Sequence, residues 1–190
     1  MGAKKVANLL RPVAKRVLRI WFDEKYISGR HFDIGFSGFI WALRSIWQRN
    51  ILRLAPPMPW PVALNCHISN SSNIHFHPDN LDNFQSPGAY FQCINAKIFI
   101  GRGVYIGPNV GIITANHDFN DLDLHLEGKD VVIKDNCWIG MNSVVLPGVV
   151  LEKRTIVGAG SVVTKNFSDG DVVICGVPAR VIKSIGGVSD

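Results

Sequence analysis

His117 is the residue whose type and surroundings most favour acid–base chemistry. It lies in the stretch ITANHDF, between residues 113 and 119. Imidazole accepts and releases a proton near neutral pH, which is what a general base must do. A base of this kind is usually held in place by a second group. Four acidic residues that follow within ten positions are candidates for this orienting role, namely Glu127, Asp118, Asp121 and Asp123.

The four cysteines suggest neither a metal site nor a nucleophile. They are Cys66, Cys93, Cys137 and Cys175, and no two form a CxxC pair. Their spacing matches neither a zinc site nor a small disulfide scaffold. We therefore expect reduced thiols in a cytoplasmic protein, with Cys137 packed inside the fold as an inert side chain.

Aliphatic residues recur at every sixth position over most of the chain. A step of six matches neither a helix nor simple strand alternation, but it fits a short strand followed by a turn. Three such units make a triangular coil, and coils stack at the ~4.8 Å spacing between strands. The residue two before each aliphatic also faces the narrow interior and is small or β-branched. The three series are Ile133, Ile139, Val145, Leu151, Val157 and Val163; Ile94, Ile100, Ile106 and Ile112; and Val62, Ile68 and Ile74.

The repeat predicts a parallel β-helix over residues 62–170, with a C-terminal tail over 171–190. It is interrupted twice, at residues 76–93 and 113–130. In a solenoid, interruptions become loops that leave the coil and commonly carry function. His117 lies in the second of these predicted loops.

Residues 1–61 form a separate segment that is predicted to be helical. Leu9, Leu10, Val13, Val17 and Ile20 have helical spacing, and a second helix is expected between residues 39 and 54. Residues 1–55 hold eleven Lys and Arg against three Asp and Glu, an excess of +8, and four of the five tryptophans lie before residue 61. The segment is thus a candidate for contact with an anionic membrane surface, or alternatively a helical cap over the first coil. No nucleic-acid motif accompanies the charge, and no secretory signal or membrane-spanning stretch is evident.

Three stretches resemble the hexapeptide-repeat acyltransferases, in the branch of the sugar O-acetyltransferases that includes galactoside and maltose acetyltransferases. ITANHDF is similar to the family's catalytic-histidine loop. NCWIGMNSVVLPGV (136–149) with VGAGSVVTK (157–165) resembles its coenzyme-binding coils, and GVPARVIK (176–183) resembles its C-terminal signature. The resemblance implies a left-handed β-helix, a homotrimer, and acetyl-CoA bound in a groove between neighbouring prisms.

The resemblance also implies roles for individual residues. His117 would be the catalytic base and Glu127 the acidic residue that orients it. Substrate contacts would come from Gln92, Asn116 and Trp138, and coenzyme contacts from Met141, Ala159, Thr164, Lys165, Arg180 and Lys183. Met141 stands where the family more often has serine.

The expected function is transfer of an acetyl group from acetyl-CoA to a hydroxyl of a sugar or polysaccharide precursor. Two alternatives remain open at this point. One is a zinc enzyme resembling the β-helical carbonic anhydrases, with His75, His77 and His117 as ligands. The other is a trimeric scaffold without catalytic activity.

Overall fold

The computed structural model describes residues 3–186 of the chain. They form two compact units, which divide between Leu64 and Asn65. Within the described residues, no helix is long and apolar enough to cross a membrane.

The N-terminal unit is helical. Its elements are α1 (Ala3–Leu18), a 3₁₀ turn η1 (Glu24–Tyr26), a π-helical turn η2 (Arg30–Ile34), α2 (Ser37–Ser45) and a second π-helical turn η3 (Ile46–Ile51). The helix expected over residues 39–54 thus begins two residues earlier and changes its winding after Ser45. Phe32, Ala42 and Trp60 lie in the core of this unit.

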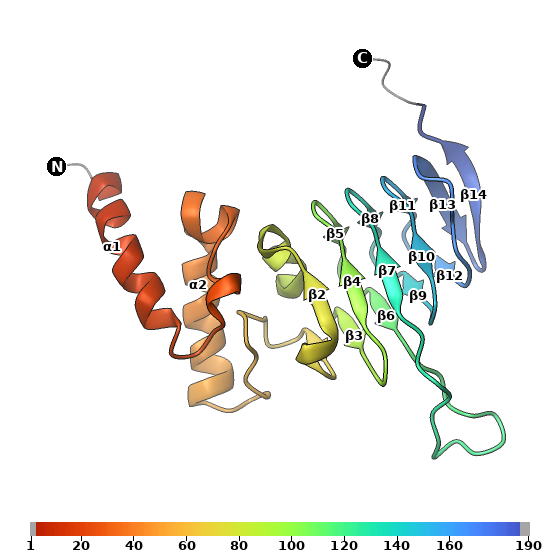
Figure 1. Cartoon of the computed structure of the whole chain (residues 1–190), viewed down its shortest axis with the longest axis horizontal. Helices are drawn as coiled ribbons and strands as arrows, with labels where there is room; N and C mark the ends of the chain where they lie inside the picture. The colour runs from red at the N-terminus through yellow and green to blue at the C-terminus, as the bar shows by residue number, and fades with distance from the viewer. Residues whose placement is uncertain (1–2, 187–190) are drawn as a thin grey trace. The chain divides into compact units, whose positions relative to one another are not determined.

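The C-terminal unit is a parallel β-helix built from three sheets (Figure 1). The first sheet contains β1 (His67–Ile68), β3 (Tyr90–Gln92), β6 (Gly111–Ile113), β9 (Val144–Val145) and β12 (Val162–Val163). The second contains β2 (Ile74–Phe76), β4 (Ile98–Ile100), β7 (Val131–Ile133) and β10 (Val150–Leu151). The third contains β5 (Tyr105–Ile106), β8 (Trp138–Ile139), β11 (Ile156–Val157), β13 (Val172–Gly176) and β14 (Ala179–Ser184).

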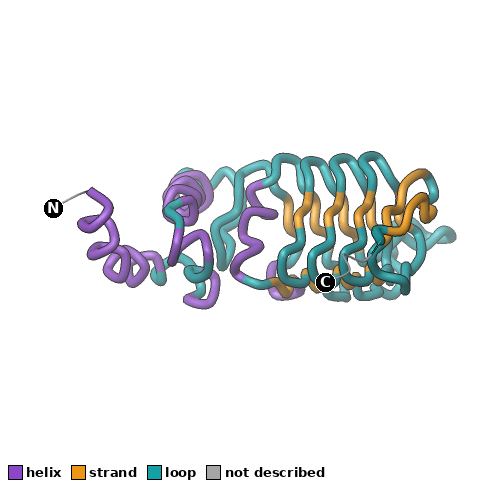
Figure 2. The backbone as a smooth tube through the Cα atoms, turned by 90° about the horizontal axis from the view of Figure 1, so that it is seen from above, coloured by secondary structure: helices purple, strands orange, loops and turns teal. Residues whose placement is uncertain are grey.

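From β3 to β11 the chain visits the three sheets in the same order on each turn, which makes these coils triangular. Strands of successive coils pair in parallel, and the coils repeat at regular intervals (Figure 2). Two edges of the prism matter below. The first–second edge is the set of turns between the first and second sheets, such as residues 146–149. The third–first edge is the set between the third and first sheets, such as residues 140–143.

The six-residue series from Ile133 to Val163 is confirmed, because all six side chains are at most 1% exposed. The small positions between them are buried as well, including Cys137, Ser143 and Thr155. Apolar side chains therefore stack in columns along the axis, and burial of apolar surface in these columns stabilises the prism.

Ile94 and Val62 do not occupy the inward positions predicted for them. Phe91 takes the place expected for Ile94, aligned with Ile68 and Ile112 of the neighbouring coils. The carbonyl of Ile94 instead accepts a hydrogen bond from Thr114 Oγ1, at 3.2 Å, within a turn. Val62 belongs to the N-terminal unit and so lies outside the coils.

The interruption predicted as a loop over residues 76–93 is largely structured. It contains the 3₁₀ helix η5 (Pro78–Gln85) and then β3. Asn83 Nδ2 donates to the carbonyl of Val104 at 2.9 Å, and Asn83 Oδ1 accepts from Ile106 N at 2.9 Å. Asn80 bonds Gly101 O and Gly103 N in the same way. These amides satisfy backbone groups of β5 and of the turn before it, at the end of the third sheet that β5 forms.

The predicted C-terminal tail is a β-hairpin over its described part. β13 pairs in parallel with β11, and β14 returns antiparallel to β13. The hairpin therefore extends the third sheet by two strands. Residues 187–190 of the predicted tail lie outside the described residues.

Candidate functional site

The loop between β6 and β7, residues 114–130, leaves the prism at the first–second edge and projects away from it (Figure 1). Its base is pinned by hydrogen bonds. Gln92 Oε1 accepts from the backbone nitrogens of Thr114 and Ala115, both at 3.2 Å. Lys129 N donates to the carbonyl of Thr114 at 2.8 Å, which closes the neck of the loop. A Cβ on Gly128 would lie 2.5 Å from the carbonyl oxygen of Ile94, so only glycine fits the returning arm there.

The outer part of this loop is a short hairpin. His117 and His125 form an antiparallel bridge, and Asp118 N donates to the carbonyl of Leu124 at 2.9 Å. The carboxylates of Asp118 and Asp121 accept backbone hydrogen bonds from Asn120 and Asp123, at 2.7 and 3.0 Å. These two carboxylates therefore shape the turn.

The imidazole of His117 is exposed and has a defined tautomer. Its Nδ1 lies 2.6 Å from the carbonyl oxygen of Leu122. A carbonyl oxygen can only accept, so Nδ1 carries the proton and donates it. The lone pair is then on Nε2, which is the atom that can take a proton from a substrate. The group that orients this imidazole is thus a backbone carbonyl.

Glu127 does not take the orienting position predicted for it, because His117 Nδ1 already donates its hydrogen bond to Leu122 O. Among the described residues, no hydrogen bond joins Glu127 to His117. Glu127 instead lines a hollow of about 340 Å³ together with Asn116, Leu126, Lys129 and Pro147. This hollow lies at the base of the hairpin. It places a carboxylate, an amide and an ammonium group around one space, which suits a polyhydroxylated molecule.

His125 is not predicted by the sequence, yet its ring centroid lies 4.3 Å from that of His117, at an interplanar angle of 36°. No motif marks it. Its only signal is the spacing of eight residues around a turn-rich stretch, which would place the two histidines opposite each other in a hairpin.

Met141 and Ala159 lie together on the third–first edge. Gly160 N donates to the carbonyl of Met141 at 2.9 Å, and a Cβ on Gly140 would lie 2.6 Å from Ala159 N. The coils therefore stack tightly at this edge, and both side chains are exposed. Trp138 stands on the outer face of the third sheet, between Tyr105 and Ile156, and is 54% exposed.

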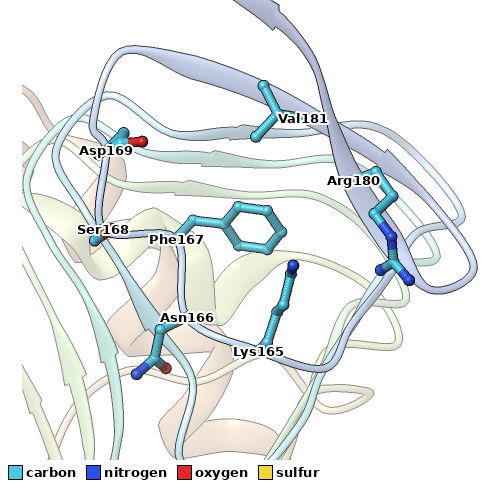
Figure 3. A pocket seen from close by; sticks show the side chains of 7 residues that line it. All are labelled: Lys165, Asn166, Phe167, Ser168, Asp169, Arg180 and Val181. Atoms are coloured by element: carbon cyan, nitrogen blue, oxygen red, sulfur yellow. The ribbon is translucent and has the colours of Figure 1, made fainter.

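Lys165 and Arg180 line a second hollow, of about 230 Å³, formed by residues 165–169 of the last coil and by β14. Figure 3 shows both basic side chains in this hollow, beside the ring of Phe167. Lys165 Nζ lies 5.8 Å from the centroid of that ring. Two cations of this kind suit an anionic group such as a phosphate.

The six predicted coenzyme residues are not gathered in one hollow of a single chain. Met141 and Ala159 share one edge, and Lys165 and Arg180 share the second hollow. Thr164 and Lys183 are exposed but do not line that hollow. The loop that carries His117 leaves from the first–second edge. Within one chain, the proposed base and the pair Met141 and Ala159 therefore lie on different edges of the prism.

The predicted zinc ligands do not form a cluster in this chain. His75 stacks on Phe99, with ring centroids 5.0 Å apart. His77 Nδ1 accepts a hydrogen bond from Asp79 N at 3.2 Å. Over the part of the chain that the structure describes, no three His, Cys, Asp or Glu residues are placed to hold a metal ion.

Cys137 is unsuited to nucleophilic chemistry. It is fully buried, and burial raises the pKa of its thiol to about 11. Its Sγ donates to the carbonyl of Glu152 at 3.1 Å. A protonated, inward-pointing thiol of this kind is inert, as its place in the repeat predicts.

Comparison with known proteins identifies the family. The model for "Bacterial transferase hexapeptide (six repeats)" matches residues 130–165. A galactoside O-acetyltransferase of Lactococcus lactis is 39% identical over 135 residues, which cover 65% of this chain and 62% of that protein. The putative lipopolysaccharide biosynthesis O-acetyl transferase WbbJ of Escherichia coli is 30% identical over 181 residues, which cover 78% of this chain and 89% of that protein.

A solved structure supports the same family assignment. Galactoside acetyltransferase in complex with coenzyme A has a TM-score of 0.57 and 25% sequence identity, and the match covers 93% of this chain and 83% of that one. Several relatives are longer than the match, which spans only 54–62% of their length. The fold is thus a left-handed parallel β-helix, and the chain belongs to the hexapeptide-repeat acyltransferase family, in the branch of the sugar O-acetyltransferases.

Proposed function

We propose that this chain transfers an acetyl group from acetyl-CoA to a hydroxyl of a saccharide, with His117 as the general base. The observation that carries the proposal is the tautomer of His117. Leu122 O fixes the proton on Nδ1 and leaves Nε2 available on an exposed loop with a pinned base. The names of the relatives, which include galactoside O-acetyltransferases, support the reaction class.

The reaction needs a single proton to move in two steps. Nε2 takes the proton of the acceptor hydroxyl while the oxygen attacks the thioester carbonyl. The tetrahedral intermediate then collapses, the C–S bond breaks, and the imidazolium returns the proton to the departing sulfur. The products are the acetyl ester and free coenzyme A. A fixed Nδ1–H also stabilises the imidazolium formed midway, because Leu122 O stays hydrogen-bonded to it.

The coenzyme is proposed to bind along the flank of the prism. Backbone groups at Met141 and Ala159, two exposed residues, would bond the pantetheine amides, and the cations of Lys165 and Arg180 would pair with phosphates. Thr164 and Lys183 would flank these contacts. Because the base and the third–first edge are separated within one chain, the loop of one subunit would serve the edge of its neighbour. A homotrimer with three such interfaces fits this requirement.

The acceptor is proposed to occupy the hollow at the base of the hairpin. Asn116 and Glu127 would bond its hydroxyl groups there. Gln92 has its side-chain oxygen committed to the loop, so only its Nε2 would remain for a substrate. Trp138 offers an exposed aromatic surface on the third sheet, against which a sugar ring or the coenzyme can pack.

The test is release of free thiol from acetyl-CoA in the presence of a panel of sugars. We expect His117→Gln to lower kcat by about 10²–10⁴-fold, since general-base catalysis contributes on that order. His75→Gln is the matched control, because His75 is also an exposed prism histidine. It should leave the rate unchanged. An acceptor-dependent rate that survives His117→Gln in folded protein would overturn the proposal, and loss of activity in the His75 variant would favour the zinc alternative.

A further inference from the structure

Helix α1 turns an apolar stripe away from the N-terminal unit. Leu9, Val13 and Val17 of the helix and Ile20 of the turn that follows it continue one helical spacing and are 70, 61, 49 and 72% exposed. A helix that packs on a water-soluble core normally hides such a stripe. Four large aliphatic side chains in one exposed row are therefore unusual and indicate a partner surface.

The polar side of α1 is the side that contacts the protein. Lys15 Nζ lies 2.6 Å from Asp33 Oδ1, and Arg11 donates to the carbonyl of Asp33. Arg19 pairs with Glu24. The helix is thus held to its unit by charged groups and by buried Leu18, while Leu9, Val13 and Val17 face outward.

Helix α2 and the following turn η3 repeat this arrangement. Ile40, Leu43, Trp47 and Ile51 are 65, 66, 56 and 59% exposed and lie on one face. The opposite face is buried and mixed in character: a Cβ on Gly38 would lie 2.7 Å from the ring of Phe32, and Ile46, Ser45 and Arg49 are buried.

The buried side chain of Arg49, on this inward face, has hydrogen-bond partners. Its guanidinium donates to the carbonyls of Val62 and Ala63, at 3.2 and 2.7 Å. Ser45 at the end of α2 accepts from Val62 N at 3.3 Å. Buried hydrogen bonds therefore fix the orientation of α2 and η3, and their apolar face is left outside as a consequence.

Charge indicates what covers these two apolar faces. Residues 1–55 carry an excess of eight positive charges. Exposed Arg16 lies three and four positions from Val13 and Ile20 of the α1 stripe. A second copy packed against these two faces would bring two strongly positive segments into direct contact, which is unfavourable. An anionic lipid surface offers both an apolar layer and negative charge.

The geometry points to an anionic bilayer as the partner: we propose that α1, α2 and η3 lie in the plane of the membrane interface with both apolar faces in the headgroup boundary. The 16 residues of α1 are too few to span a bilayer, which needs about 20. Exposed Trp47 on one stripe suits this interfacial position, where indole rings concentrate.

The experiment is co-sedimentation of the full chain with vesicles. One set contains phosphatidylcholine alone, and the other adds phosphatidylglycerol. We expect binding to the anionic vesicles only. The double substitution Val13→Glu with Val17→Glu should weaken that binding by at least about tenfold, since both side chains would lose apolar burial. Both positions are exposed, so the variant should fold and keep thiol release with a free sugar acceptor.

The matched control is Val177→Glu with Ile182→Glu, two apolar residues of the C-terminal unit that are 71 and 64% exposed. It should bind vesicles like the wild type. The proposal is overturned if the wild type does not bind anionic vesicles, or if the α1 variant binds as well as the control. A lower mass of the α1 variant in light scattering without lipid would also overturn it, because a second copy would then be the partner.

Discussion

Substitution of Asn83 by Ala tests how the open edge of the third sheet is stabilised. The side chain is 2% exposed, and its amide replaces the missing strand by bonding Val104 O and Ile106 N, both at 2.9 Å. Alanine removes both partners and leaves two backbone groups unsatisfied, Ile106 N of β5 and Val104 O just before it. Each unsatisfied buried group costs about 1–3 kcal/mol. Water can reach part of this edge, because Tyr105 is half-exposed. We therefore expect a loss of about 2–4 kcal/mol in the free energy of unfolding of the C-terminal unit.

Two measurements check this value. Urea unfolding followed by circular dichroism gives the free energy, and amide hydrogen exchange at Ile106 reports the edge itself. Asn65→Ala is the control, since Asn65 is exposed and the structure describes no hydrogen bond from its side chain. It should change the stability by less than about 0.5 kcal/mol. If Asn83→Ala were no more costly than this control, and exchange at Ile106 were unchanged, η5 would not be the edge cap.

Three further predictions concern the loop and the thiols. Gln92→Leu removes the acceptor for the Ala115 amide and leaves Thr114 N only the backbone carbonyl of residue 92, so kcat should fall by about tenfold with the KM for acetyl-CoA unchanged; an equal effect on both would contradict a positioning role. His125→Phe keeps a ring beside the proposed base and should retain activity within about threefold, whereas His125→Ala should lose about tenfold; identical rates would show that ring packing is irrelevant. Burial raises the pKa of Cys93 and Cys137 to about 11, from the ordinary 9.0. The stability that these two protonated thiols contribute is therefore complete below pH 9 and is lost as the pH rises through 11. In the native protein, a thiol reagent should label half-buried Cys175 first. Rapid labelling of Cys137 would contradict its burial.

The repeat could be predicted from the sequence because each coil imposes the same local requirement. Ile139, Val145 and Leu151 must all point inward, and the residues two before them must fit the same narrow interior. That constraint is local and repeats, so it is visible without knowledge of distant contacts.

The departures from prediction arise where contacts between distant residues decide the outcome. Ile94 fits the six-residue step, but the hydrogen bond from Thr114 commits its carbonyl to a turn. Asn80 and Asn83 carry no repeat signal, because side-chain amides there take the place of a strand. His125 faces His117 only once the hairpin has formed.

The motifs predict individual site residues, such as His117 and positions 141 and 159, but not how these residues are distributed over the prism. Their separation on two edges depends on which sheet each strand joins, and that follows only from the pairing of β6, β8 and β9.

The most direct test of the central claim is complementation between two inactive variants. One is His117→Ala, which lacks the proposed base, and the other is Ala159→Trp, which blocks the third–first edge. If the loop of one subunit serves the edge of its neighbour, co-expressed chains should form working interfaces. Random assembly gives about a quarter of the wild-type number of such interfaces, so about a quarter of the wild-type thiol-release rate should return. Mixed assemblies that form but stay inactive would contradict a catalytic site shared between subunits.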